Sequence, residues 1–212
     1  MRIVAGQWRG RALAAPKGEA TRPTADRVRQ ALFDMLLHAP WGGRDRVVGA
    51  TVLDAFAGTG ALGLEALSRG AAAADFVETR PSSLHALKAN IVLLRARDRT
   101  RVFNKDALPF AAALREGSHD IAFVDPPYGS RMLDRVIEGW QRTRFSTILV
   151  AEHATTHVLP PGADVERFGE TSVSFYGLRA GRRESPASLP PPAPSPPSAR
   201  SSDPRTPRDA RE

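Results

Sequence analysis

Short apolar runs alternate with longer amphipathic segments through the middle of this 212-residue chain. The short runs are rich in strand-forming residues, whereas apolar side chains in the longer segments recur every three or four positions, as on one face of a helix. The expected strands cover residues 51–57, 74–78, 101–106, 120–125 and 147–152. The expected helices cover residues 61–69, 81–94, 107–115 and 131–141. This alternation predicts an α/β fold with a doubly wound, mostly parallel sheet.

Different patterns precede and follow the alternation. Residues 1–14 alternate weakly and contain two glycines, which predicts a short hairpin. A helix is expected to follow, with Thr24 as its N-cap. Residues 165–168 and 171–178 predict a final antiparallel pair at the sheet edge. The apolar stripe of the N-terminal helix consists of Val28, Ala31, Leu32, Met35 and Leu36.

Positive charge is concentrated near the N-terminus. The chain carries a net charge of +7, and residues 1–30 hold seven basic side chains against two acidic ones, a local balance of +5. A basic segment beside a neutral body is typical of proteins that bind polyanions, although a solvated basic face without a partner is the alternative. The arginines expected to dock a nucleic acid are Arg2, Arg9, Arg11, Arg22, Arg27 and Arg29.

Composition excludes several other functions. The chain has no cysteine, which excludes disulfides and thiol catalysis, and its histidines lack ligand spacing, so no metal is expected. Because no apolar run has the length of a membrane span and the first residues lack a signal peptide, we expect a cytoplasmic protein. The proline-rich residues 181–212 predict a disordered tail. It follows a basic hairpin and helix extension (residues 1–45) and an α/β domain (residues 46–180).

A glycine-rich turn follows the first predicted strand. Asp54 lies on that strand, Phe56 follows it, and Gly58 and Gly60 lead into the next helix. Glycines let the backbone approach a ligand closely, so this turn is expected to hold a nucleotide cofactor. A Gly-x-Gly alone is a weak signal that would suit any nucleotide cofactor. A carboxylate at Asp54 would repel a diphosphate, and the chain contains no Gly-Lys-Ser/Thr sequence, so a phosphate-binding loop is not supported.

Acids also end the following strands. Glu78 is placed to accept hydrogen bonds from both ribose hydroxyls of an adenosine, or else is an exposed strand-end acid. Asp106, followed by Ala107, can accept a hydrogen bond from an adenine amine, can cap the next helix, or can do both. A cofactor that combines adenosine with a small cationic group fits this set, and S-adenosylmethionine fits best.

The fourth strand ends in Asp125-Pro126-Pro127-Tyr128. Two prolines stop a strand and leave a stiff turn, which by itself could be an ordinary surface turn. In a parallel sheet, however, the carboxyl ends of strands are where ligands bind. The motif resembles the (Asp/Asn)-Pro-Pro-(Tyr/Phe) sequence of class I methyltransferases that modify exocyclic amines.

A closer resemblance covers residues 1–179. The segments 1–11, 22–29, 54–60 and 62–71 resemble the RsmD family, the bacterial 16S ribosomal RNA guanine-N2 methyltransferases that act at guanine 966 in the usual rRNA numbering. Residues 78–83 depart from the family pattern, which more often has a further charged residue and no proline there. The last predicted strand matches loosely.

The resemblance implies a Rossmann-like class I methyltransferase fold, S-adenosylmethionine as cofactor, and 16S rRNA within an assembling 30S subunit as substrate; we also expect a monomer. The Asp125 carboxylate and the Pro126 carbonyl would accept the two N–H bonds of the guanine amine, while Tyr128 stacks on the flipped base. Thr24 or Arg27 would instead touch the methionine end of the cofactor. The alternatives are an adenine-N6 methyltransferase and a catalytically silent RNA-binding assembly factor.

Overall fold

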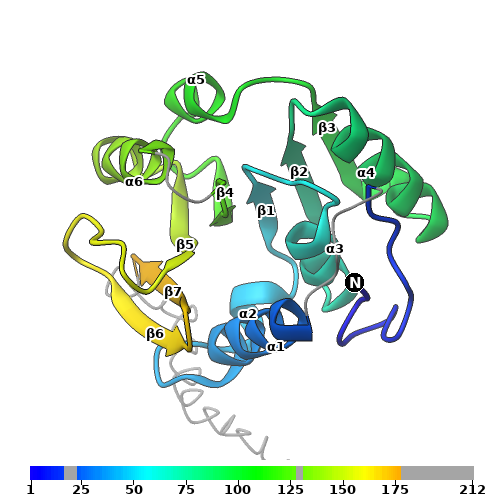
Figure 1. Cartoon of the computed structure of the whole chain (residues 1–212), viewed down its shortest axis with the longest axis horizontal. Coiled ribbons are helices and arrows are strands. Elements are labelled where there is room, and N and C mark those ends of the chain that lie inside the picture. Colours follow the sequence, from blue (N-terminus) through cyan, green and yellow to red (C-terminus); the bar gives the residue numbers. More distant parts are fainter. Residues whose placement is uncertain (17–22, 128–130, 178–212) are drawn as a thin grey trace, which may run out of the picture. The chain divides into compact units, whose positions relative to one another are not determined.

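The computed structural model describes residues 1–16, 23–127 and 131–177 (Figure 1). All of them belong to one compact unit, residues 1–180. Predictions about Arg22, Tyr128 and the tail at residues 181–212 lie outside the described residues. No described helix has both the length and the apolar character needed to cross a membrane.

A single sheet organises the described residues, and its strand order is β3-β2-β1-β4-β5-β7-β6. The first five strands along the chain run parallel, whereas β7 runs antiparallel to β5 and to β6. The predicted mostly parallel sheet with an antiparallel C-terminal edge is therefore confirmed. The strands are β1 (Thr51–Asp54), β2 (Ala73–Val77), β3 (Thr100–Phe103), β4 (His119–Val124), β5 (Ser146–Ala154), β6 (Asp164–Phe168) and β7 (Thr171–Tyr176).

Helices cover both faces of this sheet. Buried residues of α1 to α4 share one apolar cluster with the strands, and those of α5 and α6 share the other. The α-helices are α1 (Pro23–His38), α2 (Arg44–Val47), α3 (Ala61–Ser68), α4 (Pro81–Leu93), α5 (Ala107–Ala112) and α6 (Met132–Thr143), and a 3-10 turn, η1 (Arg97–Arg99), precedes β3.

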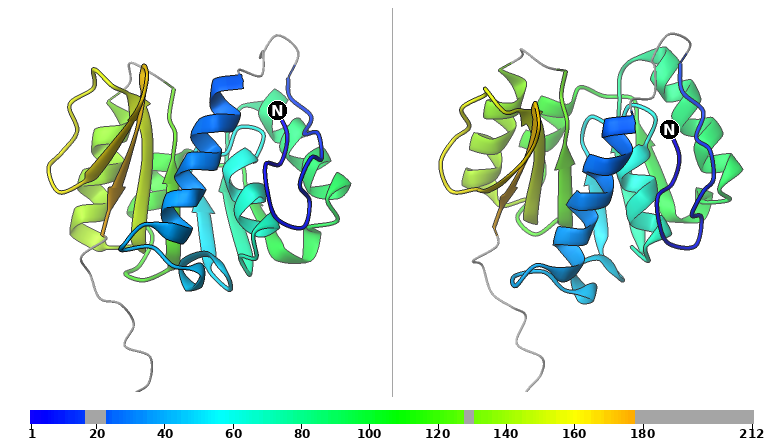
Figure 2. Two further views of the ribbon diagram at one scale, coloured as in Figure 1. Left: turned by 90° about the horizontal axis from the view of Figure 1, so that it is seen from below. Right: turned by 60° about the horizontal axis from the view of Figure 1, so that its bottom comes forward.

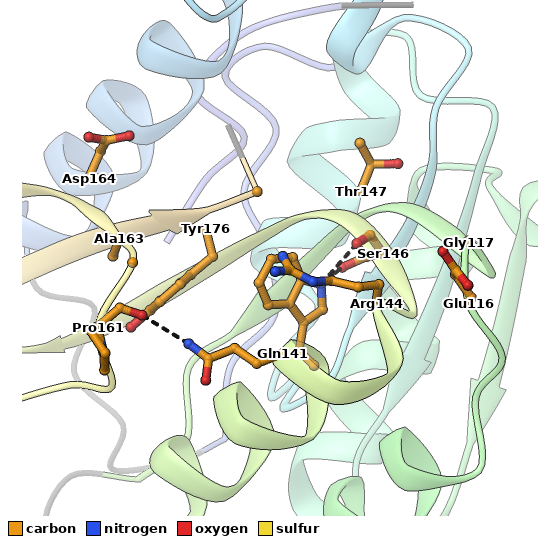
Figure 3. Close-up of a pocket in the computed structure, with 13 residues that line it drawn as sticks. Glu116, Gly117, Gln141, Arg144, Ser146, Thr147, Pro161, Ala163, Asp164 and Tyr176 are labelled. Atoms are coloured by element: carbon orange, nitrogen blue, oxygen red, sulfur yellow. Dashed lines mark hydrogen bonds between the residues drawn. The ribbon is translucent and has the colours of Figure 1, made fainter. Parts of the chain in front are cut away.

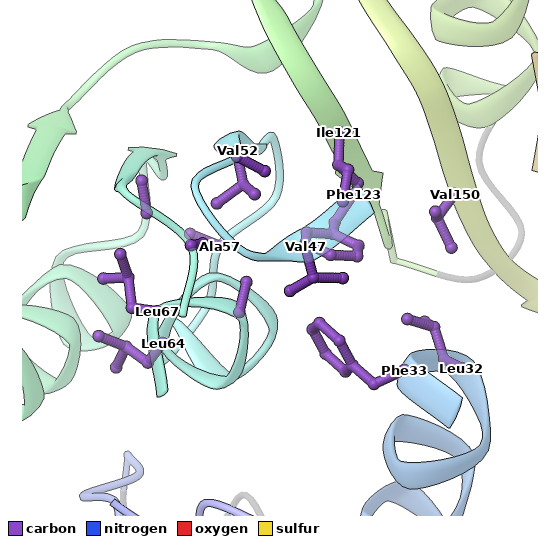
Figure 4. Close-up of a cluster of buried hydrophobic side chains, with 14 of the residues drawn as sticks. Leu32, Phe33, Val47, Val52, Ala57, Leu64, Leu67, Ile121, Phe123 and Val150 are labelled. Carbon is purple, nitrogen blue, oxygen red and sulfur yellow. The ribbon is translucent and has the colours of Figure 1, made fainter. Parts of the chain in front are cut away.

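Side-chain alternation along the strands separates the two clusters. Val52 and Phe123 face α1 and α3, where Phe33 packs with its ring centroid 5.5 Å from that of Phe123 (Figure 4). Leu53 and Val124, their chain neighbours, belong to the opposite cluster. Because neighbouring strand residues point to opposite faces, the direction of each strand-end acid is fixed by the core residue before it.

Several boundaries differ from the predictions. Strands β1, β2, β3 and β4 end earlier than expected, so that Glu78, Asp106 and Asp125 lie just beyond their strands. Helix α1 begins at Pro23, so Thr24 lies in its first turn and is not the N-cap. Proline suits this first position because the amide that it lacks would have no helical partner. The four-residue α2 was not predicted, because one turn carries no periodic pattern.

The N-terminal segment forms a hairpin-like turn that lies along α3 and α4 (Figure 2). A single antiparallel bridge joins Arg2 and Ala12, and the Ile3 amide donates to the Arg11 carbonyl at 2.9 Å. Ile3 and Leu13 are buried in the same cluster as α1 and α3. Residues 1–45 therefore share their hydrophobic core with the α/β domain.

Candidate active site

A cleft of about 670 Å³ opens at the carboxyl edge of the sheet. It collects side chains from the turns after β1, β2, β3, β4 and from the end of β5. The predicted site residues among its walls are Phe56, Glu78, Asp106, Ala107, Asp125 and Pro126. These six predicted residues thus lie at one place, although they span about seventy residues of chain.

Asp54, Gly58 and Gly60 are not among the described residues that line this cleft. The buried Asp54 carboxylate accepts a hydrogen bond from the Gly63 amide at 3.0 Å, which ties β1 to the start of α3. Gly60 has φ +82°, and an added Cβ would lie 2.4 Å from Leu87 Cδ1, so only glycine fits there. At Gly58, φ +52°, the nearest atom to an added Cβ is 3.9 Å away, so the backbone at this turn is open to a ligand.

Glu78 holds the glycine turn against the end of β2. Its carboxylate accepts hydrogen bonds from the amides of Gly58 at 2.8 Å and of Thr79 and Arg80 at 2.7 Å each. A carboxylate offers about four acceptor positions. Three are already used, so Glu78 can receive one ribose hydroxyl directly, and a second only by sharing or releasing an amide.

Asp106 caps α5. One carboxylate oxygen accepts a hydrogen bond from the Leu108 amide at 2.9 Å, which confirms the predicted capping role. The residue is exposed at the cleft, whereas Ala107 beside it is buried. Because the side chain is exposed at the cleft, its second oxygen is accessible to a donor such as an adenine amine.

Asp125 lines the cleft and is exposed, and the buried Pro126 follows it. Although the residue is exposed, the protein around its carboxyl displaces much of the water that would hydrate it. This desolvation raises the pKa of Asp125 well above its usual range, and the charges of Glu152 and Asp54 raise it further. Tyr128 lies outside the described residues.

Glu152 is a site residue that the sequence reasoning missed. The β4–β5 register pairs Val124 with Ala151, so Asp125 and Glu152, each one position further, are neighbours on the opposite face of the sheet. Burial raises the pKa of Glu152, and the positive charge of Arg29 partly offsets this. A signal was present, because Glu152 ends its predicted strand as the other acids end theirs.

The acids of the site therefore repel one another. Burial raises the pKa of Asp54 to about 7, the Gly63 amide opposes this rise, and Glu78 adds to it. Together with Asp125 and Glu152, Asp54 forms a partly buried cluster whose charged state is destabilised. A cationic ligand would relieve this repulsion, so the donor set fits a sulfonium or ammonium group better than a phosphate.

The predicted RNA-docking arginines separate into two groups. Arg2, Arg9, Arg11 and Arg27 are exposed. Arg29 is 4% exposed, donates to the Arg2 carbonyl at 2.6 Å and forms an ion pair with Asp26 at 2.7 Å. Its assignment to RNA docking is therefore wrong, because a buried, paired guanidinium cannot reach a phosphate. The side chain of Thr24 is not among those described.

A second hollow, of about 830 Å³, lies at the opposite edge of the sheet (Figure 3). Arg144 stacks over the Trp140 ring at 4.1 Å, and the Trp140 indole donates to the Ser146 carbonyl at 2.9 Å. Gln141 likewise donates to the Pro161 carbonyl at 2.9 Å. The volume is larger than that of the acidic cleft, but the polar groups named here already bond to one another, so we place the chemistry in the acidic cleft.

Neither region suggests a metal centre. Among the residues that the structure describes, no group of three or more His, Asp or Glu side chains could hold a metal ion. His157 instead pairs with Asp134 at 2.8 Å, and His153 bonds to the Ser174 hydroxyl at 2.9 Å.

The strand order, the glycine turn and the acidic cleft at the carboxyl edge define a class I methyltransferase. The solved yhhF structure from Escherichia coli superposes with a TM-score of 0.68 at 36% identity, covering 83% of this chain and 96% of that one. The family described as Conserved hypothetical protein 95 matches residues 1–176. The chain belongs to this family, the RsmD family of ribosomal RNA methyltransferases.

Individual relatives agree with this assignment. Ribosomal RNA small subunit methyltransferase D of Escherichia coli is 44% identical over 146 residues, which are 66% of this chain and 69% of that protein. YlbH of Bacillus subtilis is 35% identical over 190 residues, which cover 84% of this chain and 100% of that protein.

Proposed function

We propose that this protein transfers a methyl group from S-adenosylmethionine to the exocyclic N2 amine of a guanine in 16S ribosomal RNA, at a site of the guanine 966 type. One observation carries the proposal: the Asp125-Pro126 turn lies in the same cleft as the acids that suit an adenosine and a cation. The name of the Escherichia coli relative supports small-subunit rRNA as the substrate. We place the reaction in the cytoplasm, on an assembling 30S subunit, with the protein acting as a monomer.

The residues present fit the cofactor. Asp54 and the open backbone at Gly58 would accommodate the charged methionine end, Glu78 a ribose hydroxyl, and Asp106 the adenine amine. When bound, S-adenosylmethionine supplies a methyl group on a positively charged sulfur, which is already electrophilic. The protein's task is therefore chiefly to position the nucleophile and to receive its proton.

The nucleophile is a weak one, because the N2 lone pair of guanine is delocalised into the ring. The Asp125 carboxylate and the Pro126 carbonyl would accept its two N–H bonds, which orients the lone pair toward the methyl group. Transfer of the methyl group would make this nitrogen acidic, and Asp125 would then receive one of its protons. A raised pKa makes Asp125 a better proton acceptor than an ordinary carboxylate.

The exposed arginines would bring the RNA to this cleft. Arg2, Arg9, Arg11 and Arg27 can neutralise phosphates, with Arg22 as a further candidate outside the described residues. Base extrusion would then deliver the guanine to Asp125, with Tyr128 stacked against it. Arg29 stays out of this set because it is buried.

The test is methyl transfer from labelled cofactor to 30S particles and to 16S rRNA prepared from a strain that lacks the modification. The wild-type protein should yield N2-methylguanine by mass spectrometry. Asp125→Ala should lose transfer and keep cofactor binding, while Asp164→Ala, an exposed acid on β6, should retain both. Normal methylation by Asp125→Ala would contradict the role of this carboxylate.

The same assay separates the alternatives. N6-methyladenine as the product would replace the guanine assignment. RNA binding without any transfer would indicate a catalytically silent assembly factor.

A further inference from the structure

A second basic segment lies between α4 and β3, in a part of the chain whose net charge is neutral overall. Residues 95–101 read Arg-Ala-Arg-Asp-Arg-Thr-Arg. Arg95 and Arg97 are exposed, and Arg99 is partly exposed. Arg101 differs, because its Nε and Nη2 both donate to the Asp75 carboxylate. We refer to Arg95, Arg97 and Arg99 as the η1 ridge.

The backbone at Arg95 is unusual for an arginine. Its φ is +52°, and the Ala96 amide returns to the Ile91 carbonyl at 2.9 Å, as in the helix ending that normally places glycine at this position. A left-handed conformation is unfavourable for side chains other than glycine and asparagine. The positive charge of Arg95 near the C-terminus of α4 offsets part of this conformational penalty. A lysine or arginine one turn earlier would supply the same charge without backbone strain, so helix stability alone does not explain an arginine at this position.

The ridge is continuous with the N-terminal hairpin. The Arg99 guanidinium lies 5.1 Å from the Trp8 ring centroid, and the Trp8 amide donates to the Ser68 hydroxyl at 3.0 Å. Arg9, the next residue of the hairpin, is exposed. The guanidinium of Arg99 and the indole of Trp8 thus join the two basic segments.

The hairpin connects this ridge to the cofactor turn. At one end, the Thr59 hydroxyl contacts Met1 Sδ at 3.3 Å, and Asn90 bonds both to Ala14 and to the Thr59 carbonyl. At the other end, Trp8 meets Ser68, the last residue of α3. The eight residues of α3 span about 12 Å. That length corresponds to about three or four phosphates along one nucleic-acid strand.

We propose that the η1 ridge is a second phosphate-binding surface, which holds the RNA helix that flanks the methylated nucleotide. The inference rests on the proposed rRNA substrate and adds a docking surface to it. Arg2, next to Met1 at the end of the hairpin that contacts Thr59, would hold the backbone nearer the flipped base, and the ridge with Arg9 would hold phosphates further along the same helix. Arginines on a rigid turn suit phosphates, because each contact releases counterions whatever the sequence.

The test compares Arg95→Ala/Arg97→Ala with Arg135→Ala/Arg142→Ala, a matched pair of exposed arginines on α6. Arg99 is kept because of its contact with Trp8. Affinity for protein-free 16S rRNA is measured against salt concentration, with cofactor affinity and melting temperature as controls for folding. Each lost phosphate contact lowers the salt slope by roughly 0.7 to 0.9, so the ridge variant should lose roughly 1.5 and bind roughly 10- to 100-fold more weakly at 0.1 M salt.

The outcomes distinguish this proposal from the proposed function. Should the wild-type protein methylate rRNA while the ridge variant keeps the same slope and affinity, the ridge proposal is overturned and the function stands. If the ridge variant loses affinity for 30S particles but not for protein-free 16S rRNA, the ridge contacts a ribosomal protein, and the proposal is also overturned. Absence of methylation by the wild-type protein would remove the function itself, whereas the slope measurement would still report on the ridge.

Discussion

Replacing Asp54 by asparagine tests whether its negative charge recruits the proposed cationic cofactor. Asp54 is 2% exposed, and burial is the main reason that its pKa rises to about 7. The ionised form is the one that attracts a cation, so the ligand-free protein is fully competent only above this pH. Asparagine keeps an oxygen for the Gly63 amide, and thereby preserves the turn while removing the charge.

The size of the effect follows from the titration. With a pKa of about 7, roughly 9% of Asp54 is ionised at pH 6 and roughly 91% at pH 8. Because apparent affinity scales with the competent fraction, S-adenosylmethionine should bind about tenfold more tightly at pH 8 than at pH 6. The free energy of unfolding of the ligand-free protein changes in the opposite direction, because it decreases as the pH rises. The native pKa lies above the unfolded value, so the contribution of Asp54 is complete below about pH 3.8 and is lost as pH rises through about 7, by at most about 4 kcal/mol.

Calorimetric titration without RNA, at several pH values from 6 to 8, measures the affinity without turnover. The asparagine variant should bind more weakly than wild type at pH 8 and show a flatter pH dependence. Denaturant unfolding of the ligand-free proteins should show the matching loss of wild-type stability with rising pH. An affinity independent of pH in the wild type, or an equal pH dependence in the variant, would refute the role of the Asp54 charge.

Three further substitutions probe other parts of the site. Glu152→Gln removes a charge that raises the pKa of Asp125, so the acidic limb of the pH–rate profile should move to lower pH; an unmoved limb would argue against their coupling. Gly60→Ala, with φ +82° and a contact at 2.4 Å to Leu87, should lower the free energy of unfolding by about 1–3 kcal/mol, measured by denaturant titration. Asp106→Asn should keep the α5 cap and weaken cofactor binding, whereas Asp106→Ala should also lose about 1 kcal/mol of stability; equal cofactor affinity in wild type and Asp106→Asn would contradict the adenine contact.

The sheet was predictable because its signal is local. Each buried strand is a short apolar run, and each intervening helix repeats its own apolar face, so strand–helix alternation implied the parallel order. The antiparallel pair at residues 165–168 and 171–178 was also recognisable from its spacing. Boundaries were less accurate because the turns after the strands are set by distant contacts, such as those between the Glu78 carboxylate and the Gly58 amide.

The site residues that follow the carboxyl ends of parallel strands could be predicted from the sequence, because ligands bind at that edge of such a sheet. Glu78, Asp106 and Asp125 follow their strands and line one cleft, as expected. The sequence could not show which side chains lie close together in the folded protein. Arg29 looked like a surface cation until its burial beside Asp26 was seen, and the closeness of Glu152 to Asp125 depends on the register of two strands.

The N-terminal hairpin is attached to the body mainly through its main chain. Amides of Val4 and Ala5 donate to the buried Glu65 carboxylate, those of Gln7 and Trp8 to Ser68, and Ala14 pairs with Asn90. Every residue except proline offers the same amide. Substitutions among the outward side chains should therefore leave the hairpin attached, because none of these main-chain contacts depends on which side chain the hairpin residue carries.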